Sequence, residues 1–584
     1  MNKLERLKKI TTKPALANLL EVNPSFLTHV LYILKPNTQY TTFTIPKKSG
    51  GIRTIKAPSV KLKSLQSNLS KLLLDCIDEI NKSKSLEEKN YKQTLSHGFV
   101  RKRSIMTNAL MHLNQKNVLN IDLKDFFDSF NFGRVRGFFI KNHNFQLDPA
   151  IATVIAQIAC DDNKLPQGSP CSPVITNLIT HSLDIKLASL ARKHSCIYSR
   201  YADDMTFSTR KSVFPQQIIC QEGDHFVTGK NMNSEIVRAG FSINENKTRI
   251  QYKDSRQDVT GLIVNKKPNV KKEYWRTVKS QCHSLFRTGT FTKKTAAGVV
   301  AGNIKELEGQ LNFIDQVDRF NRPRQKAPLN PIYQYKNYGN DKTPLLSGRE
   351  KTFSKFLYYR LFYGNTKPTI LCEGKTDNTY LKSAISILAG SYPILASAKT
   401  RGSAYELLIR TVKYSKRTRF LLGLYGGAPY LCSFIKAFEK HYKFHKASKP
   451  KCPVVIVLDN DSGFKNFPKI LKGIKSATPH PTTLESDDYR NAEFIHVIHN
   501  LYIVLTPLRS KGEETDIEYL FDDATRLKQH SGKCFNIVDK RNDETDLSKD
   551  AFAKHIIKAQ KASINFDGLR PLLDRITSAI NHYN

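Results

Sequence analysis

The spacing of apolar and polar residues predicts many short elements along the first half of the chain. Residues 1–35 have the apolar spacing of short helices, and residues 40–58 predict two strands joined by a glycine turn. From about residue 60 to 265, helical periodicity alternates with short strand-like runs. A polar, proline-rich stretch at 321–344 lacks any such period and predicts a connection between domains.

Beyond this stretch the pattern changes to alternating strands and helices. A helical segment at 349–363 is followed by PTILC and CPVVIVL, two short apolar runs that each end in polar turn residues. Continuous apolar runs of this length are typical of buried parallel strands. We therefore expect a second, α/β region after a boundary near 320–365.

The charge balance indicates what the protein contacts. The 584 residues include 92 Lys and Arg against 52 Asp and Glu, which gives a formal net charge of +40. Such an excess repels itself unless a polyanion neutralises it, so we expect nucleic acid as a partner. A solvated basic surface and a membrane surface are the alternatives. A chain of this length should form two to four domains.

Other bulk features favour a cytoplasmic protein. No apolar run approaches the roughly 18 residues that span a bilayer, so no membrane partner is expected. The N-terminal segment MNKLERLKKITTK lacks the apolar stretch of a secretory signal. Ten cysteines contain no Cys-x-x-Cys pair, which argues against a zinc module and a disulfide framework.

Three carboxylates stand at predicted strand ends. Asp122 follows the apolar run of NVLNIDLKDFF, and Asp203 and Asp204 form the tip of a predicted hairpin in CIYSRYADDMTFST. Adjacent carboxylates repel each other unless divalent cations neutralise them. Three acids on two strands are the minimum scaffold for two-metal phosphoryl transfer. An ordinary surface turn, where Asp-Asp is common, is the alternative.

Four short sequence motifs resemble those of a known enzyme family. IDLKDFF, LPQGSPCSP, YADD and GFSINENKTRI occur in the order of the palm motifs, and the chain resembles reverse transcriptases over about residues 20–310. The resemblance implies a right-hand polymerase with fingers, palm and thumb, which uses dNTPs and two Mg²⁺ ions. It assigns Asp122, Asp203 and Asp204 as catalytic metal ligands.

The same resemblance assigns further roles. Phe127 matches the residue that excludes ribonucleotides, although core packing is its alternative role. Gln167 and Gly168 match the loop that contacts template and incoming nucleotide. Glycine allows the backbone to approach a base pair closely.

Three basic positions complete the implied polymerase site. Lys247 matches the lysine that neutralises or protonates the leaving pyrophosphate, although a lone lysine is more often a solvated charge. Arg53 matches the fingers residue that binds the triphosphate, with Lys47 or Lys48 assisting.

Two short signatures resemble those of bacterial retron enzymes. They are NAxxH, from Asn108 to His112, and VTG, from Val259 to Gly261. The resemblance implies that the enzyme copies its own structured non-coding RNA from a guanosine 2′-hydroxyl into branched RNA–DNA (msDNA), with host RNase H taking part. The basic and aromatic segment after Gly261 would be the thumb that contacts the RNA stem. A reverse transcriptase of another bacterial class is the alternative.

A second acidic set belongs to the α/β region. Glu373 follows PTILC, and Asp459 and Asp461 follow CPVVIVL. Because ligands of open α/β sheets gather at the carboxyl ends of strands, these acids should converge. Such a set suits Mg²⁺. The pattern resembles the Toprim domain, and Asp377 with Glu518 makes it most similar to the nucleases called the OLD family.

The Toprim resemblance implies a second catalytic site. Glu373 would be its catalytic ligand or general acid/base, and Asp377, Asp459 and Asp461 would bind one or two Mg²⁺ ions. An inactive Toprim fold that serves in dimerisation or nucleic-acid binding is the alternative, and a homo-oligomer would form through this domain.

Together these patterns predict a multidomain α+β protein. We expect fingers and palm at 1–265, thumb at 266–320, a linker and connecting helix at 321–365, an α/β Toprim domain with a mainly parallel sheet at 366–525, and a helical C-terminal extension at 526–584. Such a fusion resembles bacterial anti-phage systems in which the RNA–DNA product restrains a toxic domain.

Overall fold

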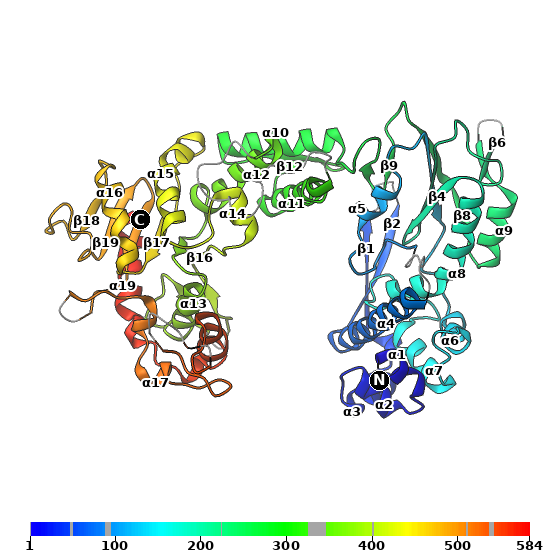
Figure 1. Ribbon diagram of the computed structural model, residues 1–584, viewed down its shortest axis with the longest axis horizontal. Coiled ribbons are helices and arrows are strands. Elements are labelled where there is room, and N and C mark those ends of the chain that lie inside the picture. Colours follow the sequence, from blue (N-terminus) through cyan, green and yellow to red (C-terminus); the bar gives the residue numbers. More distant parts are fainter. Residues whose placement is uncertain are drawn as a thin grey trace. The chain divides into compact units, whose positions relative to one another are not determined.

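The computed structural model describes residues 2–46, 51–87, 95–222, 225–324, 346–399, 402–509, 512–536, 542 and 544–584. These residues form two compact units, Met1–Lys272 and Glu273–Asn584, and each unit is described here by itself (Figure 1). Lys47 and Lys48, expected beside the triphosphate, lie outside the described residues. Within the described ranges, no helix combines the length and apolar character that crossing a membrane requires.

The first unit contains short N-terminal helices, a strand pair and a mixed helical and sheet region. Its helices are α1 Lys3–Lys9, α2 Lys13–Leu19, α3 Pro24–Thr28, α4 Val60–Glu87, α5 Ile105–Met111, α6 Phe132–Lys141, α7 Pro149–Ala159, α8 Ser172–Lys193 and α9 Lys230–Arg238. Its strands are β1 Tyr40–Pro46, β2 Ile52–Pro58, β3 Asn117–Leu123, β4 Cys196–Tyr201, β5 Asp204–Thr209, β6 Ile219–Glu222, β7 His225–Thr228, β8 Ile243–Tyr252, β9 Asp258–Val259 and β10 Leu262–Ile263.

A four-stranded antiparallel sheet is the scaffold of the first unit. Its strand order is β4-β5-β3-β8, so β3 is flanked on both sides. The apolar residues of β3 are buried, as the run before Asp122 predicted. The helix α8 buries one side in the hydrophobic core of this unit, where Ile175, Leu183 and Leu187 lie. The predicted short helices in 1–35 and the predicted strand pair at 40–58 are also confirmed.

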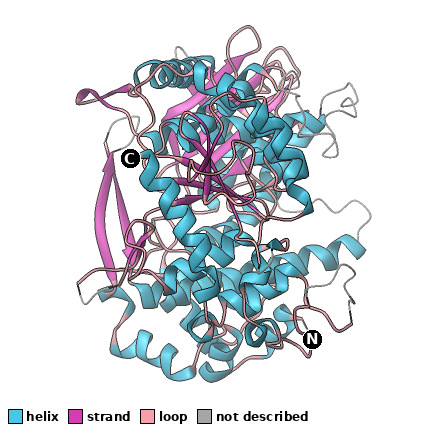
Figure 2. Ribbon diagram, turned by 90° about the vertical axis from the view of Figure 1, so that its left-hand side faces the viewer, coloured by secondary structure: helices cyan, strands magenta, loops and turns pink. Residues whose placement is uncertain are grey.

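The second unit begins with a helix, hairpin and helix and continues into an α/β region. Its helices are α10 Lys272–Thr288, α11 Ile304–Asn321, α12 Gly348–Tyr358, α13 Asp377–Ile387, α14 Lys416–Leu422, α15 Ala428–Phe444, α16 Phe467–Lys472, α17 Asp523–Arg526, α18 Lys549–Ala551 and α19 Arg570–Tyr583. Its strands are β11 Thr292–Thr295, β12 Gly298–Ala301, β13 Thr369–Cys372, β14 Ala396–Ser397, β15 Glu406–Leu407, β16 Arg410–Thr411, β17 Val454–Leu458, β18 Thr478–His480, β19 Phe494–Ile498 and β20 Leu501–Leu505. Figure 2 distinguishes helices from strands by colour.

A six-stranded sheet of order β16-β13-β17-β20-β19-β18 organises this α/β region. The pairs from β16 to β20 are parallel, and β19 and β18 add an antiparallel edge. Along β17, Val455 and Val457 face one hydrophobic core, while Val454 and Ile456 face another. Both faces of the sheet are therefore covered, which is the usual condition for parallel strands and explains the continuous apolar runs.

Each face has its own set of helices. One core joins α13 with the C-terminal residues 547–580, and the other joins α12, α15 and α16. Residues 526–584, expected as a helical extension, thus share a core with α13, because their apolar side chains complete one face of the sheet. The π-helical turn Phe552–Lys558 contributes Phe552 and Ile556 to that core.

The segment expected as the thumb also packs into the second unit from α10 onward. Arg349 of α12 lies over the ring of Trp275, 5.5 Å from its centroid, and pairs with Asp318 of α11 at 3.1 Å. Arg417 of α14 pairs with Asp315 of α11. The expected connecting helix is likewise built into the unit, because α12 buries Phe353 and Phe356.

Candidate active sites

The four-stranded sheet β4-β5-β3-β8, which we call the palm sheet, brings the three predicted polymerase acids together through its register. Asp122 of β3 is paired directly with Asp204 at the start of β5. Asp203 occupies the turn between β4 and β5, where its carbonyl accepts the backbone N–H of Leu123 at 3.1 Å. Strand β3 is therefore fixed to the hairpin tip by backbone hydrogen bonds at the acids themselves.

A buried arginine, which sequence analysis did not identify, supports this tip. Arg200 is wholly buried, and its Nη1 donates to the carbonyl of Ala202 at 2.9 Å. Ala202 has a positive φ of 57°, a backbone state that costs energy for a residue with a side chain. Arg200 also forms two 2.7 Å hydrogen bonds to the carboxylate of Asp184 on α8. The sequence offered one signal for this pair. Asp184 occupies an apolar position of α8 and Arg200 lies in the strand β4, and two opposite charges at buried positions are expected to pair.

Negative charge at the tip is only partly compensated. Partial desolvation, and then the charges of Asp203 and Asp122, raise the pKa of Asp204 to about 6, although the residue remains solvent-exposed. Burial also raises the pKa of Asp203. Lys247 of β8 places its Nζ 2.8 Å from Oδ1 of Asp122, and this hydrogen bond raises the pKa of Lys247. The lysine predicted to meet the leaving pyrophosphate thus contacts one of the predicted metal-binding acids directly.

A small cavity adjoins these acids. Its volume is about 140 Å³, and its lining includes Asp122, Asp204, Lys247, Thr260 and Gly261. The VTG signature therefore contributes two residues to the wall of the cavity beside the predicted polymerase acids, a position that its sequence alone did not indicate.

The NAxxH signature holds the same hairpin from its other side. His112 is fully buried, with Nε2 2.7 Å from Oγ of Ser199 and Nδ1 2.7 Å from Oγ of Ser208. The hydroxyl of Ser199 donates to Oδ1 of Asn108 at 2.6 Å. Burial lowers the pKa of His112 to about 3, so the ring is neutral. The first and last residues of the signature thereby link α5 to β4 and β5.

The fingers-side residues lie on or against β2. The backbone N–H of Lys56 donates to the carbonyl of Gln167 at 2.8 Å. Gly168 has a φ of +127°, and a Cβ there would stand 2.5 Å from the carbonyl of Lys56, so only glycine fits. Arg53 is exposed on β2. Its positive charge lowers the pKa of Asp203, against the larger effect of burial, which raises it.

The neighbouring rings of Phe126 and Phe127 differ in burial. Phe126 is 3% exposed and stacks on Phe241 with ring centroids 5.6 Å apart. Phe127 is half-buried and meets Phe126 edge to face at 5.5 Å. One part of the Phe127 ring is therefore free to meet a ligand, and its role as a sugar gate stays a prediction.

In the second unit, adjacent parallel strands bring Glu373 and Asp459 together. Glu373 directly follows β13 and Asp459 directly follows β17, as predicted. The backbone N–H of Asp459 lies 3.3 Å from Oε2 of Glu373. Asp461 accepts the N–H of Gly463 at 2.7 Å, and Asp377 accepts the N–H of Gly374 at 2.6 Å.

A pair of glycines between these acids in the sequence forms a turn at Glu373. Gly426 and Gly427 both have a φ of +92°, and the N–H of Gly427 donates to the carbonyl of Glu373 at 2.8 Å. A Cβ at Gly426 would stand 2.9 Å from that carbonyl. The turn leads directly into α15, whose first N–H, from Ala428, is bonded to the Glu373 carboxylate and lowers its pKa against the larger effect of burial.

Residues from the C-terminal region complete the second acidic set. Oδ1 of Asp459 accepts the N–H of Ile517 at 3.0 Å. Lys549 lies 2.9 Å from Oε2 of Glu518 and 3.7 Å from Oδ2 of Asp516. Sequence analysis included Glu518 but missed Asp516 and Lys549, because Lys549 belongs to a segment in which no chemistry was recognised.

Burial and like charge strongly disfavour ionisation in this set. They raise the pKa of Asp459 to about 9, with burial the largest cause and the charges of Asp377 and Glu373 the next largest. Burial likewise raises the pKa of Glu518 to about 7, even though Lys549 opposes the change. A bound cation would relieve both effects.

The two acidic sets fit Mg²⁺ by the chemistry of their donors. In the part of the chain that the structure describes, no three His, Cys, Asp or Glu side chains are already arranged to hold a metal ion. The carboxylates are nevertheless hard oxygen donors whose raised pKa values at Asp204 and Asp459 reflect unrelieved negative charge and burial. Divalent cations stabilise such groups in the charged form.

Comparisons with known proteins identify the class of the first unit. Residues 45–274 match the family model described as reverse transcriptase (RNA-dependent DNA polymerase). Retron Ec86 reverse transcriptase of Escherichia coli is 30% identical over 319 residues, which cover 54% of this chain and 87% of the relative. The chain belongs to the retron reverse transcriptase family.

Other relatives are matched over less of their length. Retron Mx162 reverse transcriptase of Myxococcus xanthus is 31% identical over 302 residues, 48% of this chain and 58% of the relative. The match to the Mx65 enzyme covers 56% of that relative, so this chain spans little more than half of either. A telomerase structure from Candida albicans aligns at 12% identity over 54% of this chain and 59% of that chain. Its TM-score of 0.29 is too low to support an argument.

Proposed function

We propose that the first unit is the catalytic part of an RNA-directed DNA polymerase of a retron. It copies a structured non-coding RNA into branched RNA–DNA, starting from the 2′-hydroxyl of a guanosine. The observation that carries this proposal is the pairing of Asp122 with Asp204 beside Asp203, with Lys247 2.8 Å from Asp122. Membership of the retron family supports the RNA template and the dNTP substrates.

Each polymerase residue has a defined task in this proposal. Asp122, Asp203 and Asp204 hold two Mg²⁺ ions, which would activate the primer hydroxyl and stabilise the leaving pyrophosphate. Lys247 supplies positive charge beside Asp122. Arg53 binds the triphosphate, assisted by Lys47.

The remaining polymerase residues select and position the substrates. Phe127 contacts the sugar at C2′ and excludes ribonucleotides. Gln167 and Gly168 contact the template and incoming nucleotide through the loop that is bonded to β2.

The basic segment around the start of α10 is proposed to bind the RNA stem. Lys272 and Arg276 are exposed and Lys271 is half-buried. Their charges would meet phosphates and 2′-hydroxyls, so shape matters more than sequence. Charge reversal at these three positions should weaken RNA binding and flatten its dependence on salt. An unchanged salt slope would assign the RNA to another surface.

Sequencing the nucleic acid that co-purifies with the chain tests the polymerase proposal. A retron enzyme should carry DNA joined to RNA through a 2′–5′ bond, and Asp203→Asn should carry the RNA without the DNA. Unbranched DNA in the wild-type preparation would favour a reverse transcriptase of another bacterial class.

We infer a second function for the α/β region. It is a Toprim domain of the OLD nuclease type that cleaves phosphodiesters with one or two Mg²⁺ ions. Asp459, Asp461 and Asp377 bind metal, and Glu373 is a ligand or general acid/base. The supporting observation is the approach of Glu373 to Asp459 at the ends of adjacent parallel strands, with Glu518 close by.

The fused domain is proposed to act as a restrained effector in anti-phage defence. The RNA–DNA product would hold it inactive, with host RNase H maturing that product and a homo-oligomer forming through the Toprim domain. Cell growth after loss of the DNA product measures the restraint. Toxicity should appear without the product and disappear when Glu373→Ala or Asp459→Ala is added. Toxicity that persists in both variants would favour an inactive Toprim fold.

A further inference from the structure

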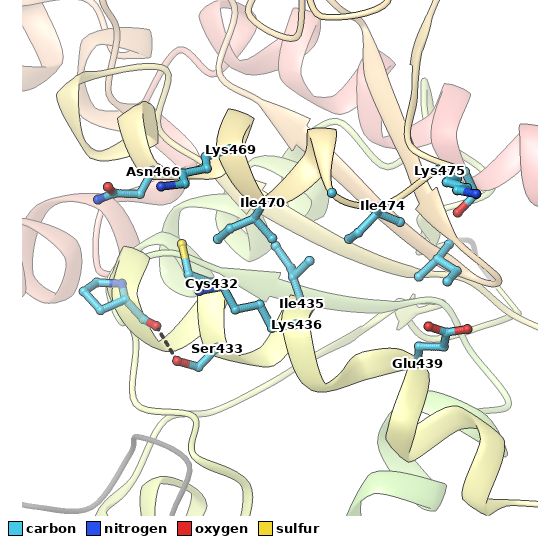
Figure 3. Close-up of a pocket in the computed structure, with 14 residues that line it drawn as sticks. Cys432, Ser433, Ile435, Lys436, Glu439, Asn466, Lys469, Ile470, Ile474 and Lys475 are labelled. Atoms are coloured by element: carbon cyan, nitrogen blue, oxygen red, sulfur yellow. Dashed lines mark hydrogen bonds between the residues drawn. The ribbon is translucent and has the colours of Figure 1, made fainter.

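A large groove separates α15 from α16 in the second unit (Figure 3). Its volume is about 1060 Å³, which is at or beyond the upper end of the roughly 300–1,000 Å³ of small-molecule pockets. Ile435, Ile470 and Ile474 line its middle, between the two helices. A cavity of this size and openness suits a segment of a polymer better than a single small ligand.

Three lysines surround this apolar floor: Lys436 of α15, Lys469 of α16, and Lys475 just after α16. We call this feature the lysine groove. All three lysines are exposed, and none has an ion pair among the described residues. Glu439 also lines the groove, but it is neutralised by Lys443 at 2.5 Å. The groove therefore carries net positive charge that the protein itself leaves uncompensated.

Both walls of the lysine groove begin at the second acidic set. One wall is α15, which starts after Gly427, the residue whose N–H donates to the carbonyl of Glu373. The other wall is α16, which follows the 3-10 turn Ser462–Asn466 that is capped by Asp461. In Figure 3, Asn466 lies toward one end of the groove, and Lys475 and Glu439 lie toward the other.

We propose that the lysine groove binds the sugar–phosphate backbone of a single nucleic-acid strand and leads it to Glu373 and Asp459. This inference rests on the proposed nuclease function and names its substrate class. A basic channel that follows the backbone is the common solution for binding single strands. The isoleucine floor would contact sugars and bases without reading their sequence. An acidic peptide has the same charge. It contains no phosphodiester for the acids at which both walls of the groove begin, so the nucleic-acid strand is the better fit.

Crosslinking can test the groove separately from cleavage. The full chain with Asp459→Asn is incubated with a single-stranded DNA oligonucleotide that carries 4-thiothymidine, irradiated, and digested for mass spectrometry. Crosslinked peptides should come from α15 and α16. Lys436→Glu with Lys469→Glu should reduce their yield by about tenfold or more, because two phosphate contacts become repulsive. The neutral pair Lys436→Gln with Lys469→Gln should give an intermediate loss.

Lys554→Glu with Lys558→Glu is the matched control. These lysines are also exposed, make the same change in net charge, and belong to the π-helical turn that packs against the other sheet face. Thermal unfolding verifies that both double variants remain folded.

Three results would overturn the proposal: no crosslinks to α15 or α16, equal losses in groove and control variants, or displacement by polyglutamate but not by unlabelled DNA. Groove crosslinks in a chain whose wild-type form cleaves no nucleic acid would uphold strand binding and refute only the nuclease function.

Discussion

The two acidic sets reach a similar composition through opposite sheet geometries. In the palm, Asp122 of β3 is the direct partner of Asp204 on the antiparallel strand β5, and Asp203 lies in the short turn that precedes β5. In the second unit, Glu373 and Asp459 follow parallel strands and are 86 positions apart. Both sets therefore join acids from segments far apart in the sequence, but the palm acids meet as cross-strand partners in an antiparallel sheet, whereas the second set meets where neighbouring parallel strands end at one edge.

The sets also differ in how their charge is compensated. Lys247 contacts Asp122, a principal acid of the palm, and the pKa of Asp204 rises to about 6. Lys549 instead contacts Glu518, and the more deeply buried Asp459 reaches a pKa of about 9. The palm is therefore closer to its ionised, metal-binding state at neutral pH. The cation proposed for the second set would therefore have to overcome a larger cost of ionisation at Asp459.

Replacing a palm acid should have the largest effect. Asp122→Asn should lower DNA synthesis on an RNA template by at least about a thousandfold, or ~4 kcal/mol, because it removes an anionic ligand with little change in volume. Asp125→Asn, which changes an exposed acid of the next turn, is the control. Retention of more than about a tenth of wild-type synthesis would remove Asp122 from the metal site. Cleavage by the second unit should be unaffected.

The corresponding change in the second set should show the greater dependence on a cation. Asp459→Asn should abolish nucleic-acid cleavage while DNA synthesis continues. Without Mg²⁺ the variant should be as stable as the wild type, because burial already favours a neutral Asp459. Adding Mg²⁺ should raise the unfolding temperature of the second unit only when Asp459 is present. An equal rise in both proteins would separate Asp459 from metal binding.

Breaking the support beneath the palm tip should be the next largest effect. Arg200→Met leaves the Asp184 carboxylate buried without its partner; of its hydrogen bonds within the described residues, the one from the hydroxyl of Tyr198 remains. Loss of one partner of a buried pair typically costs 3–5 kcal/mol, and we expect about 3 kcal/mol in the first unit. Asp184→Asn in the same chain should recover part of this loss. Proteolysis of the first unit in urea measures both variants.

These residues show how far the sequence could predict the molecule. The strands, the hairpin and the positions of Asp122, Asp203 and Glu373 follow from local periodicity and turn residues, and the structure confirms them as elements. Arg200 could not be assigned, because the periodicity of α8 indicates which face is buried but not which strand residue its Asp184 meets. Lys549 is 31 positions from Glu518, and only the folding of the C-terminal segment onto α13 brings them together.

A smaller effect is expected at the sugar gate. Phe127→Val should raise ribonucleotide use relative to deoxyribonucleotide use by about tenfold, because steric selection by one side chain is worth roughly 1–3 kcal/mol. Single-nucleotide incorporation with matched dNTP and NTP pairs measures the ratio. Phe126→Leu is the control, since that ring is buried in the core. If discrimination is unchanged and only stability falls, Phe127 serves in packing.

The smallest effect concerns His112, a buried base whose pKa burial lowers, whereas burial raises the pKa of the acids in both sets. Its pKa falls from 6.5 to about 3 in the folded chain, so the unfolded chain binds one more proton between these values. The stability that His112 contributes is present above pH 6.5 and is lost as the pH falls toward 3. Each unit of pH in that interval costs at most about 1.4 kcal/mol of stability.

His112→Gln should therefore reduce the overall stability at neutral pH and also flatten its decline between pH 6 and 5. His143→Gln, which changes an exposed histidine, should leave that decline unchanged. Urea-dependent proteolysis of the first unit at both pH values measures the two slopes, and equal slopes in wild type and His112→Gln would mean that the Ser199 and Ser208 contacts also accommodate a charged ring.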